Sequence, residues 1–137
     1  MKKKFSKSWK SSTQTRKKRK YQANAPLHLR HQMMKANLSK ELRKKYGMRS
    51  IPVRKGDTVK IMVGKNKKKT GKVKNVDKKT MVITIEKIQN QKKDGTKIDV
   101  KFNPSNLQIT EMNAEDKRRI RIKKENKEEK KDAPKKK

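Results

Sequence analysis

The fold is decided by the stretch Val53-Arg54-Lys55-Gly56-Asp57-Thr58-Val59-Lys60-Ile61, which is followed by Gly64-Lys65-Asn66-Lys67-Lys68-Lys69-Thr70-Gly71-Lys72-Val73. Apolar and polar residues alternate up to Ile61, which is typical of a half-buried β-strand. Two glycines then bracket a lysine-rich loop, and a second strand begins directly after the loop. The stretch predicts a hairpin whose backbone and four lysines can approach a polyanion together.

The segment 51–110 shows further alternation with polar turns between the apolar runs, and it predicts a mainly β domain. Five short strands in so short a segment are typical of a small barrel. The odd spacing of Val73 and Val76 predicts a bulge in the second strand. The expected apolar positions, strand by strand, are Val59, Ile61 and Val63, then Val73 and Val76, then Met81, Ile83 and Ile85, then Ile98, Val100 and Phe102, and finally Leu107 and Ile109. The expected turns are Asp77-Lys78-Lys79, Asp94-Gly95 and Pro104-Ser105-Asn106.

The charge balance identifies the class of partner. The chain has 137 residues, a formal net charge of +32 and only 28% hydrophobic residues. Nucleic acid is the default partner of such a chain, and part of the chain should be disordered in isolation. Cysteine is absent, which excludes disulfides and zinc–thiolate sites. No apolar run reaches the roughly 18 residues that a membrane span requires.

Basic residues are most concentrated before the predicted β domain. Residues 1–50 contain 17 Lys and Arg against one acidic residue, Glu41. Residues 1–24 are expected to form a basic arm that is disordered without RNA. The aromatic residues of this arm, Phe5, Trp9 and Tyr21, have two possible roles: they stack on unpaired bases, or they anchor the arm onto the protein's own folded part.

Residues 25–50 are predicted to hold two short helices. Pro26 suits a first helical turn, which places Leu27, His31 and Met34 on one face. In the second helix Ser39 is a good N-cap and Gly47 a good C-terminal residue. Glu41 favours the positive end of that helix, and Leu42 and Tyr46 are expected to dock on the barrel. Residues 111–137 are expected to form a charged helix that starts near 113–116, followed by a disordered tail.

Catalytic and metal-binding signals are weak. His28 and His31 are the only histidines, and they lack the cysteine or acidic neighbours that would complete a metal site. A role in phosphate contact or packing is therefore favoured for them. No phosphate-binding Gly-x-x-x-x-Gly-Lys-Ser/Thr loop is present, and the paired carboxylates lie in solvated, oppositely charged runs. The sequence predicts no enzyme, no cofactor, no metal and no small-molecule substrate.

The segment 53–76 resembles the KOW motif of large-subunit ribosomal proteins and of transcription elongation factors. The flanking segments strengthen the resemblance: residues 24–30, 38–46 and 49–55 look like the N-terminal half of the eukaryotic and archaeal ribosomal L-twenty-six proteins, the eukaryotic branch of the universal L-twenty-four family. Residues 83–89, 94–96 and 103–107 look like the C-terminal half. The resemblance covers roughly residues 13–122. One departure is Lys68, which stands where KOW loops commonly have a glycine, so that the loop is expected to differ in shape.

This resemblance implies an SH3-like barrel of about five strands, bound to large-subunit ribosomal RNA near the mouth of the peptide exit tunnel. It also implies a role in subunit assembly, contacts with neighbouring ribosomal proteins and with factors at the exit tunnel, and a location in the cytoplasmic ribosome, with a nucleolar stage in a eukaryote. The alternative is a KOW-domain regulator of transcription elongation. Such a regulator normally has a separate polymerase-binding domain, for which residues 1–50 are too basic and too poor in apolar residues.

The basic segments and the loop together predict an RNA interface dominated by phosphate contacts, because a lysine meets phosphate as a point charge. The expected RNA-binding residues are Arg16, Lys17, Lys18, Arg19, Lys20, His28, Arg30, Lys40, Arg43, Lys44, Arg49, Arg54, Lys65, Asn66, Lys67, Lys68, Lys69, Thr70, Gly71 and Lys72.

Overall fold

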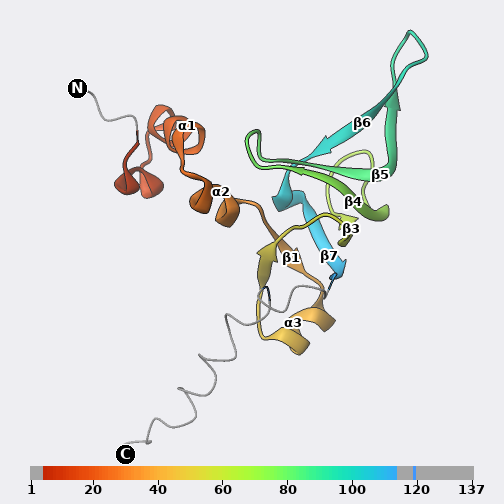
Figure 1. The fold of residues 1–137 in the computed structure, drawn as a ribbon, viewed down its shortest axis with the longest axis horizontal. Helices are drawn as coiled ribbons and strands as arrows, with labels where there is room; N and C mark the ends of the chain where they lie inside the picture. Colours follow the sequence, from red (N-terminus) through yellow and green to blue (C-terminus); the bar gives the residue numbers. More distant parts are fainter. Residues whose placement is uncertain (1–4, 114–118, 120–137) are drawn as a thin grey trace, which may run out of the picture.

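The computed structural model describes residues 5–113 and Arg119 (Figure 1). In this part of the chain three α-helices and two 3-10 turns accompany a seven-stranded sheet. The elements in chain order are η1 (Lys7–Ser11), α1 (Thr15–Asn24), α2 (Leu27–Met33), β1 (Lys35–Leu38), α3 (Lys40–Tyr46), β2 (Ser50–Pro52), β3 (Thr58–Ile61), β4 (Thr70–Asp77), β5 (Val82–Gln91), β6 (Lys97–Phe102), η2 (Pro104–Asn106) and β7 (Leu107–Glu111).

The sheet is mixed and has two edges. Its strand order is β2-β1-β7-β3-β4-β5-β6, and β1 and β7 are the parallel pair. The mainly β prediction is confirmed, whereas the prediction of a barrel with about five strands is wrong in its strand number and in its closure. The difference arises in the segment 35–52, which supplies two extra strands, β1 and β2, where the sequence pattern indicated helices and their connections.

The sheet bends where its ladders are interrupted. The register between β4 and β5 shifts between Val73 and Asn75, which confirms the bulge predicted from the spacing of the valines. A second shift lies between Thr84 and Gln89 in the pairing of β5 with β6, and Lys87 there has a φ of 62°. Beyond this point the β5–β6 hairpin projects away from the rest of the sheet (Figure 1).

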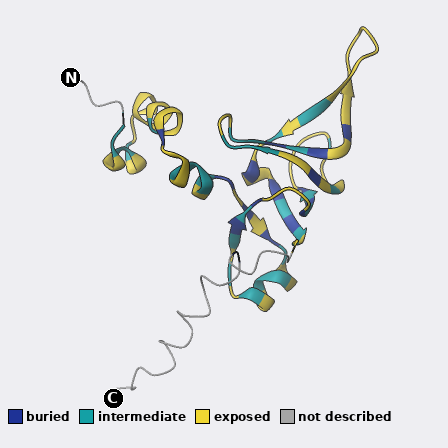
Figure 2. Cartoon of the chain, viewed as in Figure 1, coloured by how far each residue is buried: buried dark blue, intermediate teal, exposed yellow. Residues whose placement is uncertain are grey.

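The core is aliphatic and follows the alternation of the strands. Val59, Ile61, Ile83, Leu107 and Ile109 are fully buried, as the sequence predicted. Two predicted core positions are wrong: Val63 is 58% exposed and Ile98 is 42% exposed. β3 ends before Val63, and Ile98 lies on the projecting part of the hairpin, where most residues are exposed (Figure 2).

The second predicted helix is confirmed as α3. The Ser39 hydroxyl accepts a hydrogen bond from the Leu42 amide at 3.3 Å, and Gly47 ends the helix with a φ of 62°. Leu42 packs against the core as expected, while Tyr46 stays half-exposed. Residues of the first helix behave differently from the prediction, because Met34 is buried but Leu27 is 61% exposed.

Two further sequence predictions are confirmed and one lies outside the described residues. The Asp94-Gly95 turn closes through a hydrogen bond from the Lys92 amide to the Thr96 carbonyl at 2.9 Å, and residues 104–106 form the corner η2. The predicted C-terminal helix and tail fall outside the described part of the chain, except for Asn113 and Arg119. No helix among the described residues is long and apolar enough to cross a membrane.

Gly71 is the glycine that the packing of β4 on β5 requires. A Cβ at this position would lie 2.7 Å from the Ile85 Cγ2 atom and 3.2 Å from the Glu86 carbonyl oxygen.

We expect Gly71→Ala to lower the free energy of unfolding by about 1–3 kcal/mol through overpacking, measured by urea denaturation. If the clash with Ile85 is the cause, adding Ile85→Ala costs less than the sum of the two single changes. Strict additivity would contradict this explanation.

Candidate nucleic-acid interface

The loop between β3 and β4 is closed by backbone hydrogen bonds across its base. The Lys68 amide donates to the Ile61 carbonyl at 2.8 Å, and the Ile61 amide donates to the Lys69 carbonyl at 2.9 Å. Within the loop the Lys67 amide donates to the Gly64 carbonyl at 3.0 Å. All four of its lysines are exposed, so the loop holds a compact group of ammonium charges in solvent on an ordered backbone.

Lys68 adopts the backbone conformation for which glycine is favoured. Its φ is 73°, and Gly64 at the start of the loop has a φ of 91°. A non-glycine residue in the left-handed region costs roughly 1–2 kcal/mol. Lys68 therefore takes the left-handed backbone conformation that a glycine would adopt at this position. Its presence in place of a glycine does not require a different backbone path for the loop.

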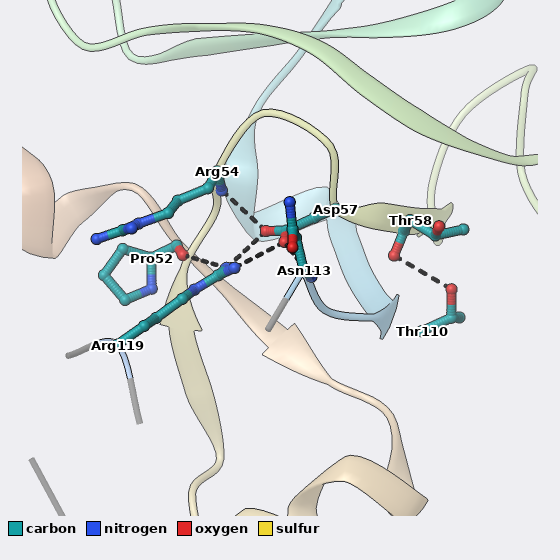
Figure 3. Close-up of polar contacts among 7 residues, drawn as sticks. All are labelled: Pro52, Arg54, Asp57, Thr58, Thr110, Asn113 and Arg119. Carbon is teal, nitrogen blue, oxygen red and sulfur yellow. Dashed lines mark hydrogen bonds and ion pairs between the residues drawn. The ribbon is translucent and has the colours of Figure 1, made fainter. Parts of the chain in front are cut away.

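A buried carboxylate anchors the turn in front of β3 (Figure 3). Asp57 has no exposed surface, and it accepts hydrogen bonds from the Arg54 amide at 2.8 Å and from the Asn113 amide at 3.2 Å. The Arg119 guanidinium donates to both carboxylate oxygens, at 2.7 and 2.5 Å. It also donates to the Pro52 carbonyl at 2.8 Å. The Asp57–Arg119 pair thus connects β2, the turn before β3 and the segment that follows β7.

The sequence prediction did not identify this cluster. Asp57 shares the alternation of Val59 and Ile61, which points its side chain toward the core and signals a buried charge in need of a partner. The identity of that partner, 62 positions away, has no local signal. In this cluster the Arg119 Nε is buried without a hydrogen-bond partner among the described residues.

Two of the predicted RNA-binding arginines use their side chains inside the protein. The Arg30 guanidinium donates to the carbonyls of Ala25 at 2.9 Å, Ala23 at 2.5 Å and Lys79 at 3.1 Å. Arg43 donates through Nε to the Leu38 carbonyl at 2.8 Å. Arg30 therefore ties the end of α1 to the β4–β5 turn.

The other predicted basic residues are exposed on separate elements. Helix α1 carries the run Arg16–Lys20 and has no buried residue (Figure 2). The remaining exposed positions are His28 on α2, Lys40 and Lys44 on α3, Arg49 before β2 and Arg54 before the Asp57 turn, together with Thr70 and Lys72 at the start of β4; Asn66 and Gly71 are partly buried. The predicted set is thus spread over the loop, α1, α2, α3 and the residues on either side of β2.

His31 and the aromatic residues of the N-terminal region are partly buried, in contrast to the exposed His28. Burial, and then the charges of Lys78 and Arg54, lower the pKa of His31 from its ordinary value. Phe5 and Tyr21 stack on one another with ring centroids 5.2 Å apart, while Trp9 lies half-buried in η1. Both rings of the pair belong to the arm, so their contact joins the arm to itself and leaves both predicted roles open. The described residues contain no group of three or more potential metal-ligating side chains among His, Cys, Asp and Glu.

Comparison with known proteins identifies a ribosomal family. Residues 12–125 match the family of the eukaryotic ribosomal proteins L26 and their archaeal L24 counterparts. The chain is 48% identical over 111 residues to the large ribosomal subunit protein uL24 of Methanothrix thermoacetophila, across 81% of this chain and 96% of that relative. It is 45% identical over 106 residues to the large ribosomal subunit protein uL24 of Korarchaeum cryptofilum, across 77% of this chain and 81% of the relative. The resemblance seen in the sequence is confirmed.

The Asp57–Arg119 pair offers a test of what holds the turn before β3. We expect Asp57→Asn to lower the free energy of unfolding by about 3–5 kcal/mol, because it leaves a guanidinium buried without a counter-ion. The double variant Asp57→Asn/Arg119→Met removes both charges and should cost less than the sum of the single variants. Chemical denaturation of all four proteins measures the coupling. Additive losses would show that the two side chains act independently.

Proposed function

The chain belongs to the uL24 family of large-subunit ribosomal proteins and is a structural, non-catalytic component of that subunit, and from this premise we propose that its β3–β4 loop is the main contact with large-subunit ribosomal RNA. The observation that carries the proposal is the geometry of this loop. Two hydrogen bonds close its base while its lysines stay in solvent. Such a loop can meet a phosphate backbone with little loss of conformational entropy.

The chemistry of the exposed charges favours backbone contact over base recognition. The chain has 36 lysines and nine arginines, and an ammonium group binds phosphate as a point charge without reading sequence. We assign secondary phosphate contacts to α1, through Arg16–Lys20, and to α3, through Lys40 and Lys44. His28, Arg49 and Arg54 extend these contacts, whereas Arg30 and Arg43 mainly hold the fold.

The place of the protein within the subunit is a further part of the proposal. The family resemblance supports a site near the mouth of the peptide exit tunnel, contacts with neighbouring ribosomal proteins and with factors at the tunnel, and a role in early assembly, which in a eukaryote takes place in the nucleolus. The five consecutive strands β7, β3, β4, β5 and β6 are the candidates for the SH3-like unit of the family, because they contain strands β3 and β4 of the KOW segment and all three register shifts of the sheet. β1 and β2 then extend that unit at one edge.

Reversing the loop charges tests the main contact. We expect Lys67, Lys68 and Lys69→Glu to weaken binding of ribosomal RNA fragments on the order of 10²–10³-fold at physiological salt, and to reduce the salt slope of log K by about 3. The matched control changes Lys92, Lys93 and Lys97 to Glu at the tip of the β5–β6 hairpin. Filter binding measures affinity, and circular dichroism verifies folding. Equal losses in the two variants would contradict a specific role for the β3–β4 loop.

The basic arm should gain order on RNA. Helix α1 buries none of its residues, and an isolated helix of this length is marginal in water. In the free protein we expect the amides of residues 5–24 to exchange rapidly and those around Ile61 and Ile83 to be protected. Addition of ribosomal RNA should slow exchange in the arm, because phosphate neutralises its repelling charges. Strong protection of the arm without RNA would contradict this expectation.

A further inference from the structure

A hollow of about 390 Å³ lies between the N-terminal helices and the sheet. Gln22 of α1 and Met33 of α2 form one side, Met81 of the β4–β5 turn another, and Lys101 and Phe102 at the end of β6 a third. The β4–β5 turn reaches toward α2 (Figure 1), and the hydrogen bond from Arg30 to the Lys79 carbonyl ties the two together at 3.1 Å. This hydrogen bond holds two walls of the hollow, α2 and the β4–β5 turn, relative to one another. The volume of the hollow lies in the range of small-ligand sites.

The walls combine flat apolar surface with amide groups. The Phe102 ring and the two methionine thioethers offer partners for an aromatic plane. The Gln22 amide has no hydrogen-bond partner among the described residues. Asn103, which also lines the hollow, uses its Oδ1 to accept from the Ser105 amide at 3.0 Å, and its NH₂ group has no hydrogen-bond partner among the residues that the structure describes. Amide donors and acceptors beside apolar planes are the groups that read the edge of an unpaired base.

We propose that this hollow receives one unpaired nucleobase of the bound RNA, stacked against Phe102 and the methionines, with the attached phosphate near Lys101. The proposal rests on the proposed function, because the RNA that the protein binds supplies the base. Charge supports this occupant: Lys101 lines the hollow, and none of the described residues that line it is acidic. The acid of the adjoining turn, Asp77, accepts hydrogen bonds from the Thr80 hydroxyl and from the Lys79 and Thr80 amides, at 2.6, 2.8 and 3.3 Å. These bonds are the main cause of its lowered pKa, to which the charge of Lys101 adds a smaller contribution.

Methyl NMR of the full chain tests the proposal with the four nucleoside 5′-monophosphates as probes. Ribose 5-phosphate, which lacks the base, is the control for phosphate binding alone. Aromatic ring currents from a bound base should shift the ¹³C-methyl signals of Met33 and Met81 with at least one nucleotide. The signals of the core residue Met34 and of Met48, which lies away from the hollow, should not move. Equal shifts with ribose 5-phosphate, shifts spread over all the methyl groups, or no shift at millimolar nucleotide would overturn the proposal.

Variants of the walls complete the test. Gln22→Ala and Lys101→Ala should each raise the dissociation constant of the nucleotide about 2- to 12-fold, the loss of one hydrogen bond. Gln91→Ala and Lys97→Ala, on the projecting hairpin, are matched controls and should leave it unchanged; equal effects in both pairs would overturn the proposal. The β3–β4 loop variant separates the two ideas. If it binds RNA normally while the methyl shifts persist, the proposed function fails and the base site stands.

Discussion

The buried carboxylate of Asp57 is the constraint on which the rest of the structure depends. It lies in the turn directly before β3, and its bonds to Arg54, Asn113 and Arg119 set the direction in which that strand leaves the turn. The direction of β3 places the side chains of Val59 and Ile61 in the core, and it also determines where the β3–β4 loop begins. A buried ion pair adds little net stability over an apolar pair of the same shape. Its value here is to select one arrangement in a chain with few apolar residues.

The fold reconciles a small aliphatic core with an excess of positive charge. Core residues occupy alternate positions of β3, β5 and β7, whereas the cations occupy the loop, α1 and α3, where solvent screens them. Closing the β3–β4 loop brings like charges together, which opposes folding of this segment in the absence of a polyanion. In the proposed complex RNA phosphate would remove that repulsion, so the same charges that weaken the free protein would stabilise the complex. Folding and binding would then be coupled through this electrostatic term.

Local patterns in the sequence predicted the parts of the fold that depend on local interactions. The alternation in β3, β5 and β7, the capping of α3 by Ser39 and Gly47, and the bulge after Val73 all have a signal within a few residues. Helix α1 and strands β1 and β2 were missed, because β1 exists only through pairing with β7 and β2. Exposure of the loop lysines could be predicted in the same local way. The partners of Arg30, Arg43 and Arg119 could not be predicted, because they depend on how the tertiary fold places the accepting oxygen atoms.

The structure divides its cations by chemistry. Arg30, Arg43 and Arg119 direct their guanidinium groups at carbonyls or at a buried carboxylate, while the loop lysines stay in water. A guanidinium is weakly hydrated and presents five donors in a fixed fork, so it can serve several acceptors inside a protein. An ammonium is strongly hydrated and remains favourable in solvent until phosphate replaces part of its water. The chain has nine arginines beside its 36 lysines, and three of these arginines maintain the fold. The arginine content is therefore no sign of base-edge recognition. In the proposed complex, changes among the exposed lysines would adjust RNA affinity without disturbing the contacts that hold the sheet together.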